Sequence, residues 1–278
     1  MSADFLTQMA AGSRERVRQA MRRTDAAALR ERALATPAPP ALALSGRFDL
    51  IAELKLRSPA AGVLGAGDTD PAAHVGPYAR AGAAAVSVLT EPSRFDGSLE
   101  HLEAAAQALR PLAVPVMRKD FLVDPYQLLE ARVAGAAGVL VIVRMLAAEP
   151  LAAMLAGARE LGLFVLLEAF DEADLERAQS VAAAWPAGAP ALLVGVNCRD
   201  LASLAVVPER LLALAAHLPG GVPRVAESGV GSAPDAARVA RAGYDAVLVG
   251  SALMRAHDPG ALAGEMLEAG RQARDVRS

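Results

Sequence analysis

Eight short apolar runs, rich in β-branched residues, recur along the chain, and their spacing most constrains the fold. They cover residues 50–55, 84–90, 115–119, 138–143, 163–168, 191–197, 223–228 and 246–250. The runs begin roughly 20 to 35 residues apart, which is the repeat of a strand followed by a helix. Stretches with the apolar period of a helix, such as residues 124–135 and 171–185, lie between them. We therefore expect a parallel sheet whose strands are joined by helices.

Eight strand–helix repeats predict an α/β fold of the (β/α)8 TIM barrel type. A doubly wound open sheet is the structural alternative. Its dinucleotide fingerprint G-x-G-x-x-G is missing between the first strand and the first helix, and the glycine-rich residues 62–67 follow a proline within a loop. The sequence therefore favours the barrel.

The chain divides into a short first part and a long second part. Residues 13–36 have the pattern of one or two amphipathic helices, and the proline-rich residues 37–44 are typical of a stiff connector. We expect residues 1–47 to form an N-terminal helical extension that packs on the barrel surface. Residues 48–278 are then the (β/α)8 barrel catalytic domain.

Charge and cysteine content narrow the classes of partner. A net charge of −3 and a pI near 5.9 give no reason to expect nucleic acid or an anionic membrane surface. The single cysteine, Cys198, cannot form an internal disulfide and fits a reducing cytosol. The first residues lack the pattern of a secretory signal, and no apolar stretch approaches the length of a membrane helix. We expect a soluble, cytoplasmic protein.

Polar residues end five of the eight predicted strands, and side chains two apart on a strand share a face. They are Glu53 and Lys55 on the first strand, Lys119 on the third, Glu168 on the fifth, Asn197 and Arg199 on the sixth, and Glu227 on the seventh. One charge at a strand end is more often a salt bridge in a loop than a catalyst. Five such strands predict a site where these barrels carry their active sites, at the carboxyl ends. Three carboxylates and two lysines there shift one another's pKa values, as acid–base chemistry requires.

The remaining reactive residue types do not join this group. The four histidines, His74, His101, His217 and His257, fall in predicted helices or loops away from the strand ends. No cluster has the spacing of a metal site, so no metal is expected. Adjacent side chains on a strand point to opposite faces, so Cys198 is expected to point away from the face that carries Asn197. A buried cysteine with no chemical role is therefore favoured over a nucleophile.

Two small dipeptides predict a phosphorylated substrate. Ser228-Gly229 follows the seventh strand and Gly250-Ser251 follows the eighth. Loops after these two strands, with a helix N-terminus, commonly form the phosphate pocket of a (β/α)8 barrel. Either dipeptide alone is only a turn signal, but both together in register favour a phosphate site.

Taken together, these motifs resemble the indole-3-glycerol phosphate synthase family of tryptophan biosynthesis, over nearly the whole chain. The resemblance is carried by "IAELKLRSPAAG", "SVLTEPSRFDGS", "RKDFLVDPYQLLEAR", "GVNCRDL", "AESGV" and "GSALM". The family also has a helical extension before its barrel. It is a lyase family whose reaction closes the indole ring of 1-(2-carboxyphenylamino)-1-deoxyribulose 5-phosphate with loss of carbon dioxide and water. The resemblance implies no cofactor, and it makes other tryptophan-pathway enzymes candidate partners.

The resemblance also implies roles for the strand-end residues. Lys119 is expected to be the general acid that protonates the substrate carbonyl oxygen, and Glu168 the general base of the later dehydration. Lys55 is expected to bind the substrate carboxylate, while Glu53 and Asn197 orient Lys119 and the substrate.

Other residues match the family's binding positions. Arg199 and Glu227 are expected to line the same opening, Glu227 within the catalytic group and Arg199 within the binding group. Ser58, Ser228, Gly229, Gly250 and Ser251 match phosphate-binding positions, and Phe95 matches an aromatic wall.

The sequence departs from the family pattern at a few polar positions. Leu56 follows Lys55 where a basic residue is common, and Phe170 stands where a polar residue is usual. Residues 58–62 lack a frequent lysine, and residues 201–208 lack a frequent acid. These departures leave open a paralogue acting on a modified anthranilate-derived substrate. A non-catalytic phospho-ligand-binding barrel and a related phosphosugar isomerase are further alternatives, although retention of Lys119 and Glu168 argues against a barrel without catalysis.

Overall fold

The computed structural model describes residues 5–59, 62–64, 70–200 and 203–275, and within these ranges eight parallel strands close into a barrel. The strands are β1 (Asp49–Leu54), β4 (Ala85–Leu89), β5 (Val116–Lys119), β6 (Gly138–Ile142), β7 (Phe164–Ala169), β8 (Leu192–Asn197), β9 (Arg224–Glu227) and β10 (Ala246–Val249). They follow the closed order β1-β10-β9-β8-β7-β6-β5-β4. The predicted (β/α)8 barrel is confirmed, and the open doubly wound sheet is excluded.

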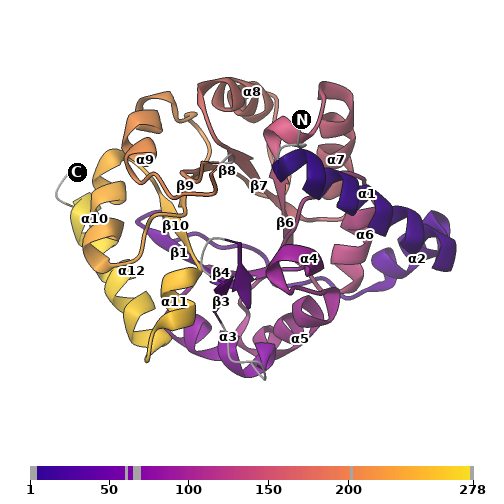
Figure 1. Ribbon diagram of the computed structural model, residues 1–278, viewed down its shortest axis with the longest axis horizontal. Coiled ribbons are helices and arrows are strands. Elements are labelled where there is room, and N and C mark those ends of the chain that lie inside the picture. The colour runs from indigo at the N-terminus through magenta and orange to yellow at the C-terminus, as the bar shows by residue number, and fades with distance from the viewer. Residues whose placement is uncertain (1–4, 60–61, 65–69, 201–202, 276–278) are drawn as a thin grey trace.

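Helices surround the barrel on its outside (Figure 1). Those that follow the strands are α3 (Pro71–Arg80), α4 (Pro92–Phe95), α5 (Leu99–Leu109), α6 (Tyr126–Val133), α7 (Ala148–Glu160), α8 (Glu172–Ala183), α9 (Glu209–Ala213), α10 (Ala233–Ala242), α11 (Ser251–Arg255) and α12 (Pro259–Asp275). Short 3₁₀ turns cover Arg110–Leu112, Val143–Met145 and Leu214–His217. Between successive strands, the helices return the chain to the amino end of the barrel, so the next strand is parallel to the last.

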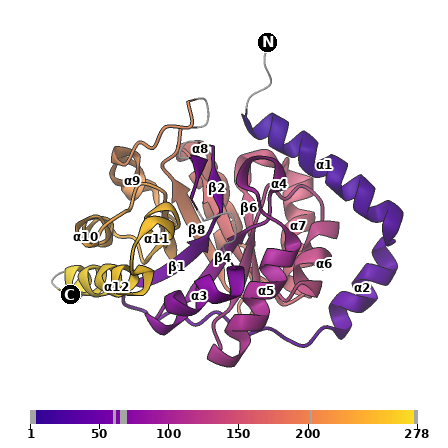
Figure 2. The same ribbon diagram turned by 60° about the horizontal axis from the view of Figure 1, so that its bottom comes forward.

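Two helices precede β1, and they lie along one side of the barrel (Figure 2). These are α1 (Phe5–Arg23) and α2 (Ala26–Ala35). Asp25 caps α2 by accepting hydrogen bonds from the backbone N–H groups of Ala27 and Ala28. Residues 1–4 of the expected extension, and residues 60–61, 65–69, 201–202 and 276–278 of the expected barrel, lie outside the described ranges.

Each of the eight barrel strands begins and ends within one residue of the predicted run. The agreement has a physical cause, because strands such as β1, β4 and β7 are buried along their whole length and are therefore mostly apolar. Inward side chains such as Ile51, Met117 and Leu166 fill the barrel. Outward side chains such as Leu50 and Val194 pack under the helices.

A small hairpin, not predicted from the sequence, lies between β1 and α3. Its strands β2 (Arg57–Ser58) and β3 (Gly62–Val63) pair antiparallel. Ser58 is buried, whereas Val63 is the most exposed large apolar side chain among the described residues. The hairpin therefore stands at the carboxyl end of β1, beside the expected site.

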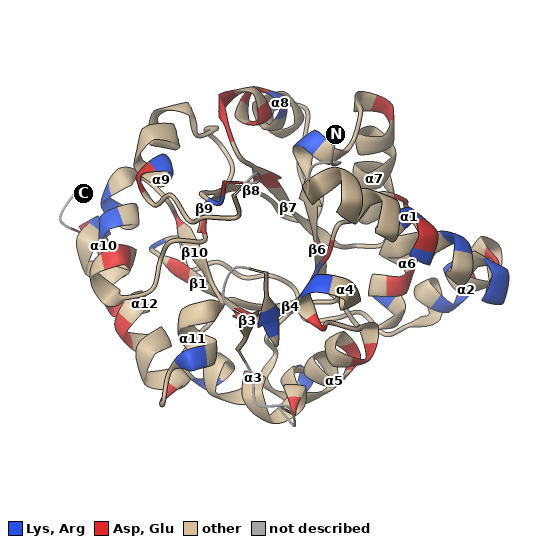
Figure 3. Cartoon of the chain, in the orientation of Figure 1, with Lys and Arg blue, Asp and Glu red and all other residues tan. Residues whose placement is uncertain are grey.

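Most charged residues lie on the outer helices, and several arginines are on α1 and α2 (Figure 3). On the barrel strands, Glu53, Lys119, Glu168 and Glu227 are at or next to the carboxyl ends, whereas Asp49 and Arg224 begin β1 and β9. None of the described helices combines the length and the apolar character needed to cross a membrane.

Candidate active site

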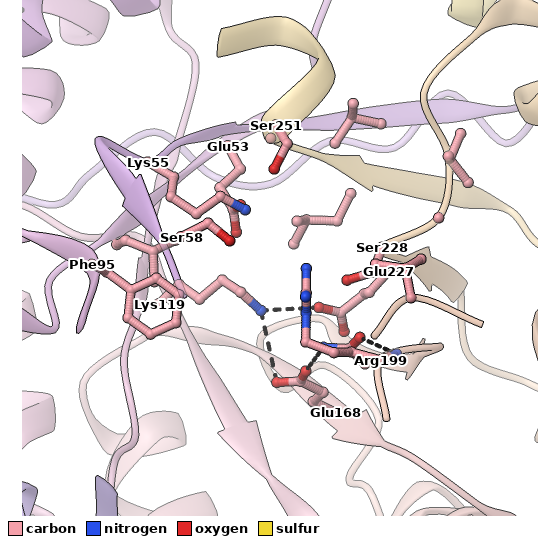
Figure 4. A pocket seen from close by; sticks show the side chains of 18 of the residues that line it. Glu53, Lys55, Ser58, Phe95, Lys119, Glu168, Arg199, Glu227, Ser228 and Ser251 are labelled. Atoms are coloured by element: carbon pink, nitrogen blue, oxygen red, sulfur yellow. Dashed lines mark hydrogen bonds and ion pairs between the residues drawn. The ribbon is translucent and has the colours of Figure 1, made fainter. Parts of the chain in front are cut away.

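A cavity of about 500 Å³ opens at the carboxyl ends of the barrel strands. Every site residue predicted from the sequence lines it. These residues are Glu53, Lys55, Ser58, Phe95, Lys119, Glu168, Asn197, Arg199, Glu227, Ser228, Gly229, Gly250 and Ser251. Figure 4 shows the labelled members converging on the cavity from separate strands and loops. The convergence follows from the fold, because equivalent ends of parallel strands meet at one end of a barrel.

Lys119, at the end of β5, lies beside two carboxylates, that of Glu168 on β7 and that of Glu227 on β9 (Figure 4). Its Nζ donates a hydrogen bond to Oε2 of Glu227 at 3.1 Å and lies 3.7 Å from Oε2 of Glu168. The Glu168 and Glu227 side chains are almost fully buried, and that of Lys119 is 15% exposed on the cavity side. The ammonium group is therefore held by protein on one side and presented to the cavity on the other.

The cluster shifts the pKa values of its members. Burial raises the pKa of the Glu227 carboxyl to about 8; Lys119 opposes this increase, whereas the neighbouring Glu168 adds to it. Burial alone lowers the pKa of Lys119, but the attraction of the surrounding carboxylates, chiefly Glu168 and Glu227, outweighs it and raises the pKa above its ordinary value. At neutral pH the cluster thus holds an ammonium group and a largely protonated carboxyl. Such a set can donate and accept protons within one cavity.

Glu53 and Lys55 form a second buried pair, at the end of β1. Nζ of Lys55 lies 2.6 Å from Oε1 of Glu53, and the two side chains are 10% and 3% exposed. The strand phase places Glu53 inward with Ile51, as predicted. Lys55 is therefore a second cation facing the same cavity.

Asn197 joins β8 to the carboxylates. Its Nδ2 donates a hydrogen bond to Oε1 of Glu168, and its Oδ1 accepts one from the backbone N–H of Arg199 at 3.0 Å. Both the NH2 group and the oxygen of the amide are thus hydrogen-bonded, which fixes the orientation of the Asn197 side chain. Arg199 forms an isolated antiparallel β-bridge with Val206. Its guanidinium donates a hydrogen bond to the Leu204 carbonyl at 2.6 Å.

Four of the five small residues predicted for phosphate binding follow β9 and β10, and the fifth, Ser58, lies in β2. Ser228 and Gly229 both have positive φ, of 65° and 69°. A Cβ on Gly229 would also lie 2.8 Å from Sγ of Cys198, so that position requires glycine on two counts. Gly250 follows the adjacent strand β10 and is the N-cap of α11, which begins at Ser251. The turn conformation brings backbone close to the cavity, as an anion site needs.

Three aromatic rings form a wall that the sequence predicted only in part. Phe95 packs against Phe121 with ring centroids 6.1 Å apart, and Phe5 packs edge-on against Phe121 at 5.7 Å. All three line the cavity. Phe121 lies two residues after Lys119, out of the strand, so strand phase gave no signal for it. Phe5 belongs to α1, whose docking position no local pattern reveals.

The helix α1 is attached beside Lys119 by polar contacts. Arg16 lies 2.7 Å from Oδ1 of Asp120 and 3.4 Å from Oε1 of Glu91. Ser13, on the same helix, accepts a hydrogen bond from the Gln127 amide at 3.0 Å. Glu91 also caps α4, the helix that carries Phe95. We name these three contacts of Arg16 and Ser13 the α1 latch. It joins α1 to the loops after β4 and β5 and to the first turn of α6.

Phe170, one of the departures from the family pattern, lines the cavity next to Glu168. The guanidinium of Arg144 lies 5.1 Å from the centre of its ring, and Nε of Arg144 lies 2.6 Å from Oδ2 of Asp174. The position is therefore an apolar part of the cavity wall, backed by an ion pair.

The other reactive side chains lie elsewhere, as predicted. His74 and His101 are on α3 and α5, and His217 and His257 are in a turn and a loop. Cys198 is buried in the outer apolar layer, where burial raises the pKa of its thiol. Across the described ranges, no group of three or more histidine, cysteine or acidic side chains could hold a metal ion.

Comparison with known proteins identifies relatives over most of the chain. The family model described as indole-3-glycerol phosphate synthase matches residues 6–266. A protein of that name from Parafrankia sp. (strain EAN1pec) is 45% identical over 252 residues, which is 90% of each chain. Another of that name, from Salinibacter ruber, is 42% identical over 252 residues and 89% of each chain. Among solved structures, 3-hexulose-6-phosphate synthase from Salmonella typhimurium has a TM-score of 0.59 at 17% identity, over 81% of this chain and 99% of that one.

Proposed function

The chain belongs to the indole-3-glycerol phosphate synthase family, and we propose that it closes the indole ring of 1-(2-carboxyphenylamino)-1-deoxyribulose 5-phosphate. Carbon dioxide and water leave, and indole-3-glycerol phosphate is formed. The observation that carries the proposal is the Lys119 ammonium, which lies 3.1 Å and 3.7 Å from two buried carboxylates and faces the cavity. Ring closure of this kind needs a proton donor and a proton acceptor in one cavity.

In the proposed first step, the ring carbon attacks the substrate ketone and Lys119 protonates the carbonyl oxygen. A lysine with a raised pKa keeps its proton at neutral pH until a stronger base, the developing alkoxide, forms beside it. The ammonium also stabilises the negative charge that grows on that oxygen. Glu227 is proposed to hold Lys119 in place through its 3.1 Å hydrogen bond.

In the proposed later steps, the carboxylate leaves as carbon dioxide and the hydroxyl leaves as water. Lys55 is proposed to bind the substrate carboxylate, with Glu53 fixing the position of its ammonium at 2.6 Å. Glu168 is proposed to be the base that removes the proton during dehydration. The hydrogen bond from Asn197 orients one carboxylate oxygen of Glu168 and leaves the other directed toward Lys119.

The two ends of the substrate are proposed to occupy the two chemically different ends of the cavity. The phosphate is assigned to the small residues Ser58, Ser228, Gly229, Gly250 and Ser251, with Arg199 nearby. The aromatic ring is assigned to the apolar wall that contains Phe95. Because α1 contributes Phe5 to that wall, we propose that residues 1–47 are a functional part of the site and residues 48–278 the catalytic barrel. A cytoplasmic location, and contact with other enzymes of the pathway, follow as proposals from this metabolic role.

The test is incubation of the purified chain with the carboxyphenylamino-deoxyribulose phosphate, followed by indole absorbance and product analysis. We expect formation of indole-3-glycerol phosphate with release of carbon dioxide, and none from the Lys119→Ala variant. Calorimetry under the same conditions separates binding from turnover. Tight binding without product would overturn the proposal in favour of a non-catalytic phospho-ligand-binding barrel.

A further inference from the structure

Gly195, on β8, lies where an inward-facing side chain would enter the site. A Cβ built on it would be 2.1 Å from Oε1 of Glu227 and 3.1 Å from Cδ1 of Leu166. The backbone at Gly195 does not have positive φ, so its conformation is open to any L-residue. Space alone, and not backbone geometry, therefore requires glycine here.

The register explains how Glu227 comes to occupy this space. Glu227 is paired with Asn197 across β8 and β9, and Gly195 is paired with Val225 two residues deeper in the barrel. The Glu227 carboxyl leans toward Gly195, so that Oε1 lies over the glycine while Oε2 accepts the hydrogen bond from Lys119. Oε1 is buried and has no hydrogen-bond partner among the described residues, so its position rests on packing.

The same arrangement occurs on the neighbouring strands β1 and β10. A Cβ on Gly250 would lie 2.2 Å from Oε1 of Glu53, the oxygen that contacts Lys55 at 2.6 Å. The carboxyl groups of Glu227 and Glu53, each of which contacts a lysine of the site, thus both have a glycine beside them. Gly250 also belongs to the proposed phosphate end, so Gly195 is the position where this packing can be tested alone.

We propose that Gly195 is a positioning residue for the proposed reaction, whose missing side chain makes the space that lets Glu227 hold Lys119. The inference rests on the proposed function. In this inference Gly195 does not contact the substrate, because it acts only by determining the position of the Glu227 carboxyl.

The size of the effect follows from the distances. With alanine at position 195, the carboxyl oxygen must move about 1.3 Å, from 2.1 Å to the 3.4 Å at which ordinary contact begins. The Lys119–Glu227 hydrogen bond is 3.1 Å long, and a shift of that size can break it. A misplacement of about 1 Å in a catalytic group can cost about 10²-fold in rate. We therefore expect Gly195→Ala to lower kcat about 10²-fold, with KM changed less than about threefold.

A double-mutant cycle of Gly195→Ala, Glu227→Ala and both together tests the mechanism. Removing the carboxyl leaves room for the new methyl group. In the Glu227→Ala background, Gly195→Ala should therefore cost no kcat and less melting temperature than in the parent, because only the 3.1 Å approach to Leu166 remains. Equal losses in both backgrounds, or a parent kcat that Gly195→Ala leaves within about twofold, would overturn the proposal.

Gly138, at the amino end of β6, supplies the matched control. A Cβ there would lie 2.5 Å from ring carbons of Phe164, so Gly138→Ala crowds the barrel away from the cavity. It should lower the melting temperature while leaving the kcat of the folded fraction near that of the parent. If the parent protein shows no turnover, the proposed function is wrong, and so is the effect of Gly195 on the reaction. The melting temperatures of the same four proteins would still decide whether Gly195 makes the space for the Glu227 carboxyl.

Discussion

Arg16→Met tests whether the α1 latch controls substrate binding. Methionine keeps the long apolar stem and a similar helix propensity, and it removes the guanidinium that contacts Asp120 at 2.7 Å and Glu91 at 3.4 Å. Ser13 and the apolar face of α1 remain. The change therefore weakens the attachment of α1 without altering any residue that lines the cavity.

The magnitude follows from what Asp120 retains. A hydrogen bond to a charged group is worth about 1.5–3 kcal/mol. Asp120 keeps the guanidinium of Arg118 at 3.2 Å, the Thr90 hydroxyl at 2.8 Å and a backbone N–H, so its charge is not left unpaired. The Arg16 side chain is 28% exposed, so we reduce the value to about 1–2 kcal/mol, which is about 5- to 30-fold in an equilibrium. Since Phe5 lines the cavity from α1, we expect KM to rise by up to that factor, which is reached when the undocked form predominates.

Steady-state kinetics and hydrogen exchange of residues 5–23 provide the assay. The matched control is Arg18→Met, because Arg18 is 61% exposed and pairs only with Glu15, one turn away on the same helix, among the described ion pairs. We expect Arg18→Met to change neither KM nor the exchange of α1. If Arg16→Met behaves like Arg18→Met in both measurements, α1 docking does not govern substrate binding and the reasoning is wrong.

Other predictions concern the proposed chemistry. Lys119→Ala should lower turnover by about 10⁴-fold or more, and a variant with more than about a tenth of parent turnover would contradict its role as the general acid. Glu168→Gln should slow dehydration more than ring closure, which single-turnover analysis of intermediates can separate; equal slowing of both steps would count against it. Ser251→Asp should raise KM strongly by repelling the phosphate. An unchanged KM in a folded variant would show that the phosphate binds at another part of the cavity. Because the folded-state pKa of Glu227 is raised to about 8 from an ordinary 4.5, the folded state binds an extra proton between these values, so stability should fall as pH rises through that window. Denaturant unfolding at pH 5 to 8 should show a flatter pH dependence for Glu227→Gln, and parallel curves would refute the shift.

The barrel and most of the site were predictable because both depend on strand phase. An inward apolar residue such as Met117 fixes the direction of Lys119 two positions later, and Leu166 does the same for Glu168. The fold then brings equivalent strand ends together. Local sequence was enough to predict these positions.

The rest of the site depends on contacts that no local pattern contains. The Arg16–Asp120 pair is separated by 104 residues and the Ser13–Gln127 pair by 114. Amphipathic periodicity predicted that α1 is a helix, but not which loops its arginines meet. The packing of the Glu227 carboxyl against Gly195 was also not predictable, because a glycine inside a strand does not reveal which side chain occupies the space beside it.

The separation of these contacts has a consequence for the order of events during translation. α1 is synthesised first, and its buried side chains Leu6, Met9 and Val17 have no docking surface until β5 and α6 have been made. β1 likewise needs β10, nearly 200 residues later in register, before the barrel can close. Pairings this distant are slow to form, and apolar surface stays exposed while the chain waits. The cavity is therefore completed only after nearly the whole chain has left the ribosome, and a shorter nascent chain carries an unpaired strand and an undocked amphipathic helix.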